Sequence, residues 1–164
     1  MDLQRESIWI SYCSTAITDC EPFHLFHFGS HHRLAAPVAA WEQLKIGGGT
    51  PPILTRHGWL TIYHGVSELS ASPGSPRKLC YSAGVLVLSE EFPQVIRFRS
   101  REPVLIPELL QERQGLVANV VFPTGIDRRD DLGSPDRFDV YYGMADNRIG
   151  VARLDAPEHL PSMC

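Results

Sequence analysis

Short hydrophobic segments separated by turn residues recur along the chain. Seven of them, four to six residues long, are rich in β-branched, aromatic and aliphatic side chains and are bounded by Gly, Pro, Asp or Ser. These segments are residues 8–12, 59–63, 84–88, 95–99, 119–122, 138–142 and 149–152. Residues 107–114 alone suggest a helix, since a proline opens that segment and Gly115 follows it. The short segments and their spacing predict an all-β fold.

Three of the predicted strands also share a pattern. In each, an aromatic or aliphatic residue stands four positions before a tyrosine, so that both side chains lie on one face of the strand. The pairs are Ile8 and Tyr12, Trp59 and Tyr63, and Phe138 and Tyr142. A repeated multi-stranded unit is typical of a β-propeller or a similar repeat fold. Aromatic pairs on strands are also common in all-β proteins of other kinds, so the pattern alone leaves both interpretations open.

Composition and charge exclude several classes of protein. The 164 residues suffice for one globular domain, and 43% hydrophobic with 21% charged residues excludes a disordered or fibrous chain. The net charge of −4, without a basic run, disfavours binding to nucleic acid or to an anionic membrane. No apolar run approaches the roughly 18–20 residues of a membrane span, and the first residues do not resemble a signal peptide. The four cysteines fit no disulfide framework, which predicts free thiols in a cytoplasmic protein.

The segment around Lys45 is the first candidate for chemistry. Lys45 precedes three glycines at 47–49, the reverse of the order in a Walker A loop, but a lysine beside a glycine loop can hold a phosphate as a point charge. His64 ends a predicted strand before Gly65, where an imidazole is well placed to touch a ligand. From these segments alone, a surface lysine beside a flexible hairpin and an ordinary loop histidine remain the alternatives.

Other polar segments carry weaker signals. Asp146 follows the aromatic residues 141–142, and a carboxylate beside aromatic rings suits a sugar, although a turn aspartate before Asn147 is the alternative. The charged residues 127–131 predict a solvated loop. The histidines at positions 24, 27, 31 and 32 match no metal-ligand spacing, so no metal site is expected. No nucleophilic triad and no glycosidase pair of carboxylates is recognisable.

Taken together and in order, these motifs resemble glycoside hydrolase family 130, which contains the β-mannoside phosphorylases. The similarity is strongest between Lys45 and Leu88 and covers about residues 7–155. The segments that carry it are residues 44–53, 58–66, 81–88, 119–123 and 141–146, with residues 27–29 similar to the His-Trp-Gly turn of the family.

The resemblance implies a five-bladed β-propeller. At roughly 40–50 residues for each four-stranded blade, the chain would hold about three blades of antiparallel sheet. Residues 1–164 are therefore expected to be the C-terminal part of a propeller that lacks its N-terminal blades. Open sheet edges in such a piece favour a homo-oligomer.

The resemblance also implies an activity. Members of the family cleave β-mannosidic bonds, mostly by inverting phosphorolysis that yields α-mannose 1-phosphate. The expected partners are a β-mannoside oligosaccharide and inorganic phosphate, which is a co-substrate, and no cofactor is expected. A non-catalytic or vestigial glycan-binding module and a β-mannosidase are the alternatives.

Residue by residue, the resemblance places phosphate binding at Lys45 and His64. Asp146 matches a sugar contact of the mannosyl subsite, and Tyr81 is expected on the acceptor side. Hydrolytic members tend to lack the two phosphate ligands, which disfavours a β-mannosidase. The catalytic aspartate and the phosphate-binding arginines of the family lie in its N-terminal half, so no catalytic residue is assigned. Residues 12–22 depart from the family pattern, which leaves the structure of residues 13–26 open.

Overall fold

The computed structural model describes residues 6–13, 28–69, 74, 76–133 and 136–161, and it confirms that the fold is all-β. The expectation for residues 14–26, and the histidines at 24 and 27, lie outside the described residues. The strands are β1 (Ile8–Tyr12), β2 (Gly29–Ala35), β3 (Lys45–Gly48), β4 (Ile53–Thr55), β5 (Gly58–Leu69), β6 (Lys78–Leu88), β7 (Ile96–Arg99), β8 (Val121–Arg128), β9 (Arg137–Met144) and β10 (Arg148–Asp155). The helical elements are the 3-10 helices η2 (Ala40–Glu42) and η3 (Asp130–Leu132) and the helix α1 (Leu110–Arg113).

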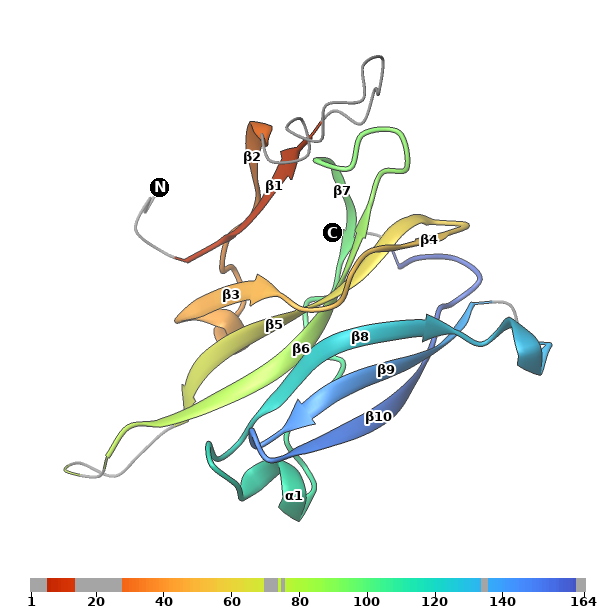
Figure 1. Cartoon of the computed structure of the whole chain (residues 1–164). Coiled ribbons are helices and arrows are strands. Elements are labelled where there is room, and N and C mark those ends of the chain that lie inside the picture. The colour runs from red at the N-terminus through yellow and green to blue at the C-terminus, as the bar shows by residue number, and fades with distance from the viewer. Residues whose placement is uncertain (1–5, 14–27, 70–73, 75, 134–135, 162–164) are drawn as a thin grey trace, which may run out of the picture.

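The strands form three antiparallel sheets, arranged in the order of the chain (Figure 1). The first sheet is β1–β2, the central sheet has the order β3–β5–β6–β7 with β4 also paired to β5, and the third has the order β8–β9–β10. In the described residues these sheets contain two, five and three strands rather than four each. The propeller and its number of blades remain predictions.

Several predicted elements have different limits in the structure. Strands β5 and β6 are much longer than residues 59–63 and 84–88, because their ladder continues from Trp59 opposite Leu88 to Leu69 opposite Lys78. Backbone pairing of this kind does not require apolar side chains. The glycine segment predicted as a loop instead pairs with β5 as strand β3.

Two further predictions of local structure were wrong. The helix expected over residues 107–114 is the single turn α1, because the backbone is extended at its N-cap, Leu109, and again at its C-cap, Gln114. The charged run is not wholly a loop, since Asp127 and Arg128 belong to β8 and pair with β9. Backbone pairing with the antiparallel strand β9 makes these two residues part of a strand despite their charged side chains.

The central sheet is buried on both faces. On one face Leu60, Ile62 and Val85 pack with Val140 of β9. On the other face Tyr63, Leu86 and Leu88 pack with Ala35 of β2. Consecutive residues of β5 therefore face different neighbouring sheets, as the alternation of side chains along a strand requires.

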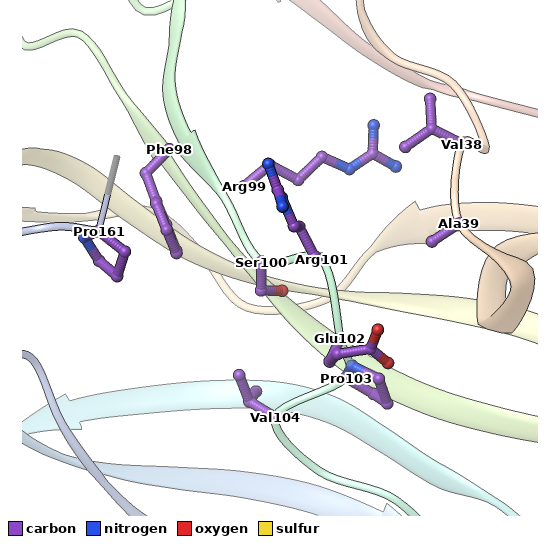
Figure 2. A pocket seen from close by; sticks show the side chains of 10 residues that line it. All are labelled: Val38, Ala39, Phe98, Arg99, Ser100, Arg101, Glu102, Pro103, Val104 and Pro161. Atoms are coloured by element: carbon purple, nitrogen blue, oxygen red, sulfur yellow. The ribbon is translucent and has the colours of Figure 1, made fainter. Parts of the chain in front are cut away.

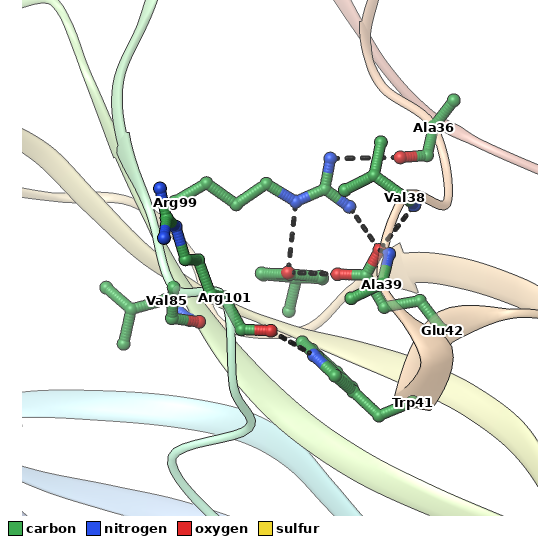
Figure 3. A network of polar contacts seen from close by, with 10 residues as sticks. Ala36, Val38, Ala39, Trp41, Glu42, Val85, Arg99 and Arg101 are labelled. Carbon is green, nitrogen blue, oxygen red and sulfur yellow. Dashed lines mark hydrogen bonds and ion pairs between the residues drawn. The ribbon is translucent and has the colours of Figure 1, made fainter. Parts of the chain in front are cut away.

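Glu42 and Arg99 form the centre of a buried polar network, and Figure 3 shows the contact between these two residues. Glu42, which is fully buried, accepts hydrogen bonds from the Tyr63 hydroxyl, from Arg99 at 2.6 Å and from the backbone N–H of Val38 at 2.9 Å. Arg99 also donates from Nε to the Tyr63 hydroxyl at 3.1 Å and from Nη1 to the carbonyl oxygen of Ala36 at 2.9 Å. The network ties the linker before β3 to β5 and β7.

The third sheet carries a similar contact. Glu112 of α1 accepts a hydrogen bond from the Tyr142 hydroxyl at 2.7 Å and bonds from the backbone N–H groups of Glu108 and Leu109 at 2.7 and 2.8 Å. Burial is the main cause that raises the pKa of Tyr142 to about 12, and the bond to Glu112 adds to it. Both tyrosine hydroxyls therefore stay protonated and donate at neutral pH.

Candidate functional site

The four residues predicted from the sequence to bind ligand line one pocket. Its volume is about 450 Å³, and it lies where the central sheet meets the third sheet. Lys45 comes from β3, His64 from β5 and Tyr81 from β6, whereas Asp146 comes from the turn between β9 and β10. The complete lining is Lys45, His64, Tyr81, Val117, Val120, Phe122 and Asp146.

Register explains why the residues of the central sheet converge. Gly47 pairs with His64 across the β3–β5 ladder, and Lys45, two residues earlier on β3, lies on the same face. On the next ladder Tyr81 pairs with Val66, two residues after His64. Because side chains alternate between the two faces of a sheet, the ammonium of Lys45, the imidazole of His64 and the phenol of Tyr81 lie on one face. This face is turned toward the third sheet.

His64 is closely packed and only 9% exposed. Its Nδ1 lies 3.1 Å from the carbonyl oxygen of Gly48, and its ring centroid lies 4.4 Å from that of Phe122. A Cβ at position 47 would lie 2.5 Å from Cε1 of His64, so a glycine is required there. Burial lowers the pKa of His64, and the charge of Lys45 lowers it further, so the imidazole is neutral at pH 7.

Lys45 is the cation of the pocket. Its Nζ lies 6.0 Å from the centroid of the Tyr81 ring and 3.6 Å from a carboxylate oxygen of Glu6. The Lys45 and Glu6 side chains are 37% and 70% exposed, and ion pairs between such exposed groups contribute little free energy. The ammonium can therefore exchange Glu6 for a bound anion at small cost.

Asp146 is held by a tight turn. Ala145 and Asp146 have φ values of 47° and 50°, a region that non-glycine residues rarely adopt. The turn is bonded to the segment before β8, since Ala145 N–H donates to the carbonyl of Val120 at 3.0 Å and Val117 N–H donates to the carbonyl of Ala145 at 3.3 Å. These bonds hold the exposed carboxylate of Asp146 at the rim of the pocket.

A larger pocket, of about 640 Å³, holds none of the predicted residues (Figure 2). It lies between the end of β7 and the linker before η2, and Val38, Phe98, Val104 and Pro161 are among its lining residues. Arg99 in its wall is already engaged by Glu42. The smaller pocket is the better candidate site, because all four residues predicted to bind ligand line it and none of them lines the larger pocket.

The candidate pocket has limited chemistry of its own. It offers a cation, a neutral imidazole, a phenol and one carboxylate, which suits binding of an anion and a sugar. Asp146 is the only carboxylate among the described residues that line it, so these residues do not include an acid and base pair. Across the part of the chain that the structure describes, no group of three or more His, Cys, Asp or Glu side chains could hold a metal ion.

Sequence reasoning missed two contributors to this site. Phe122 covers the imidazole, and the carbonyl of Gly48 fixes its orientation. Phe122 lies in a segment that served as a strand signal and as part of the family resemblance but not as a candidate for binding, and a backbone carbonyl leaves no signal in residue types. A contact between strands as distant in sequence as β5 and β8 is set by the packing of the two sheets.

The fold is all-β, and the groups that line the pocket between two of its sheets are suited to an anion and a sugar, which is the chemistry expected of a carbohydrate-active class of protein. The model of a family described as β-1,4-mannooligosaccharide phosphorylase matches residues 3–163, and the chain belongs to this family, glycoside hydrolase family 130. The family inferred from the sequence motifs is thereby confirmed.

Characterised relatives agree with this assignment. The chain is 34% identical to a 1,2-β-oligomannan phosphorylase of a Thermoanaerobacter species over 90% of its own length, and 36% identical to a β-1,4-mannooligosaccharide phosphorylase of Ruminococcus albus over 77%. The solved structure of a β-1,2-mannobiose phosphorylase from Listeria innocua, in complex with β-1,2-mannobiose, superposes with a TM-score of 0.63 at 29% identity over 78% of the chain. The chain spans 43%, 35% and 33% of these three proteins.

Among the described residues, no helix is both long and apolar enough to cross a lipid bilayer. The cytoplasmic location and the absence of nucleic-acid and membrane binding remain predictions.

Proposed function

We propose that this chain is the C-terminal part of an inverting β-mannoside phosphorylase, and that its pocket binds inorganic phosphate and the mannosyl residue. The observation that carries the proposal is the convergence of Lys45, His64, Tyr81 and Asp146 on one pocket. Phosphorolysis would transfer the mannosyl group to phosphate with inversion and release α-mannose 1-phosphate. Inorganic phosphate is the co-substrate, and no cofactor takes part.

Each side chain has a distinct part in the proposed reaction. Lys45 supplies the positive charge that draws the phosphate dianion, and His64 beside it makes a hydrogen bond to the same ion. Asp146 accepts hydrogen bonds from hydroxyl groups of the mannosyl ring, and Tyr81 lines the acceptor side. Holding phosphate in place next to the sugar removes the entropic cost of bringing the two reactants together.

The proton donor is proposed to lie outside this chain. Protonation of the leaving oxygen needs a carboxylic acid on the face of the sugar opposite to phosphate. Asp146, the only carboxylate among the described lining residues, is assigned to sugar binding. The chain alone should therefore bind phosphate and mannoside without catalysing phosphorolysis. This expectation agrees with its coverage of less than half of each phosphorylase relative compared above.

The test is a phosphorolysis assay of the purified 164-residue chain with β-1,2- and β-1,4-mannobiose. We expect no mannose 1-phosphate, but measurable phosphate binding that falls about tenfold or more in Lys45→Ala, as for loss of a charge-assisted hydrogen bond. The exposed Lys78→Ala, at the far end of β6, is the matched control. Robust turnover would show that the proton donor is present in this chain. Undiminished phosphate binding by Lys45→Ala would refute the proposed phosphate site.

A non-catalytic glycan-binding module is the second candidate, favoured because Asp146 is the one carboxylate among the described residues that line the pocket. It predicts that mannobiose binds equally well with and without phosphate, which calorimetry can decide. A β-mannosidase is disfavoured by the phosphate ligands Lys45 and His64. The proposed homo-oligomer would form through β7 and β10, which are edge strands of their sheets, and light scattering that reports a monomer would exclude it.

A further inference from the structure

The imidazole of His64 has a fixed pattern of donor and acceptor. Its Nδ1 lies 3.1 Å from the carbonyl oxygen of Gly48, and a carbonyl oxygen can only accept. Nδ1 must therefore carry the ring hydrogen. In the neutral ring Nε2 then has a lone pair and no hydrogen, so it offers an acceptor rather than a donor.

Nε2 is open to the pocket. In the described part of the chain, every buried side-chain nitrogen or oxygen has a hydrogen-bond partner. Among the described residues no group is hydrogen-bonded to Nε2, so this nitrogen is not one of the buried atoms, and His64 lines the pocket. The missing side chain of Gly47 clears the space beside it, because a Cβ there would lie 2.7 Å from Nε2.

We propose that this pocket selects an anion that carries its own hydrogen, because Nε2 of His64 accepts a hydrogen bond from the protonated oxygen of hydrogen phosphate while Lys45 balances the charge. The inference rests on the proposed phosphate site and adds a rule of selectivity to it. Sulfate has a similar size and the same tetrahedral shape, but at neutral pH it has no hydrogen to donate. It would place a bare oxygen against the lone pair of Nε2.

The selectivity should depend on the protonation of His64. The ionisable groups that face it are Lys45 on β3, Tyr81 on β6 and Asp146 on the β9–β10 turn, with Glu6 paired to Lys45. Sulfate keeps its charge between pH 5.5 and 7.5. A pH dependence of sulfate binding is therefore assigned to the conversion of Nε2 from acceptor to donor, and His64→Gln is the check on this assignment.

The experiment is calorimetric titration of the full chain with inorganic phosphate and with sulfate at pH 7.5, 6.5 and 5.5. At pH 7.5 we expect phosphate to bind at least about tenfold more tightly than sulfate, the effect of one hydrogen bond to a charged group. Sulfate should bind more tightly as the pH falls, because the protonated ring can donate from Nε2. His64→Gln should remove this pH dependence. It should also reduce the affinity ratio of phosphate to sulfate to within about threefold, because the glutamine amide can both donate and accept a hydrogen bond.

His57→Gln is the matched control, since His57 lies outside the pocket and its Nε2 contacts the carbonyl oxygen of Pro157. This variant should keep the wild-type selectivity. Equal affinity for the two anions at pH 7.5, with sulfate binding independent of pH, would overturn the rule while leaving the phosphate site in place. Failure of both anions to bind would overturn the proposed phosphate site itself. If His64→Gln does not fold, the phosphate and sulfate affinities of the unchanged chain across the pH series still test the selectivity rule.

Discussion

Tyr63 and Tyr142 hold equivalent positions in two neighbouring sheets. Each donates its hydroxyl hydrogen to a buried glutamate that also caps a helical turn. Tyr63 pairs with Gly84 of the next strand, and Tyr142 pairs with Gly150. A Cβ at either glycine would lie within 2.8 Å of the tyrosine ring. Glutamate, tyrosine and glycine thus recur as one unit, which fits a repeat fold better than chance pairing of aromatic residues.

This equivalence predicts similar responses to removal of the two hydroxyl groups. Tyr63→Phe and Tyr142→Phe should each lower the free energy of unfolding by about 1–3 kcal/mol, because a buried carboxylate loses a donor. Urea denaturation measures the change. Tyr141→Phe on the exposed face of β9 should leave the midpoint almost unchanged. A neutral result at both buried tyrosines would show that the glutamates are satisfied without them.

The ion pair between Arg99 and Glu42 should contribute more. Glu42 is fully buried, and Arg99→Met would remove its only charged partner among the described residues. Breaking a buried pair from one side typically costs about 3–5 kcal/mol, since the remaining charge stays desolvated. Thermal unfolding of Arg99→Met should therefore begin well below that of the unchanged chain. Arg77→Met, which breaks the exposed pair with Glu68, is the control and should not shift the transition.

Two adjacent glycines should differ sharply in their effect on the pocket. Gly47→Ala places a methyl group 2.5 Å from the His64 ring, whereas a Cβ at Gly48 meets nothing within 4 Å. We expect Gly47→Ala to displace the imidazole and weaken phosphate binding by about tenfold or more, and Gly48→Ala to leave it unchanged. Calorimetry of the two variants gives the comparison. Equal phosphate affinity in both would mean that His64 does not contact the ion.

His64 also predicts a dependence of stability on pH. Its pKa is lowered in the folded chain, chiefly by burial, so the unfolded chain binds more protons in this range. The contribution to stability is complete above the unfolded pKa of about 6.5 and is lost as the pH falls through the lower folded pKa. Urea midpoints at pH 7.5 and 5.5 measure it. His64→Gln should flatten this part of the profile, and an unchanged slope would assign the effect to other groups.

The sequence singled out residues that line one pocket, but it was less accurate about the limits of the strands. Lys45, His64, Tyr81 and Asp146 were found because each stands in a motif, and period-two alternation then brings the first three to one face. Their roles in binding remain predictions. The lengths of β5 and β6 were not predictable from apolar patterns, because the outer part of this ladder includes polar residues and is held by backbone pairing, with Glu68 opposite Leu79 and Lys78 opposite Leu69.

The buried glutamates show a second reason for missed features. A single glutamate in a sequence is expected at the surface. Glu42 and Glu112 are buried instead, and each accepts a hydrogen bond from a tyrosine of a later strand. Their common spacing, five residues after Pro37 and Pro107, is visible in the sequence. Its meaning depends on tertiary contacts over 21 and 30 residues. Local patterns carry no information about such partners.

The turn that carries Asp146 depends on close contact with Gly115. A Cβ at this position would lie 2.2 Å from the carbonyl oxygen of Ala145, which is backbone and cannot move aside as a side chain would. Gly115→Ala should therefore cost about 1–3 kcal/mol, as overpacking does, and push the turn away from the segment before β8.

Because Asp146 sits on that turn, Gly115→Ala should weaken mannoside binding while phosphate binding through Lys45 and His64 persists. Gly125→Ala is the matched control, since its Cβ would meet Tyr141 at an ordinary 3.6 Å. Calorimetry with mannobiose and with phosphate separates the two effects. Loss of both ligands together would indicate general unfolding, and loss of neither would show that the turn does not position the sugar contact.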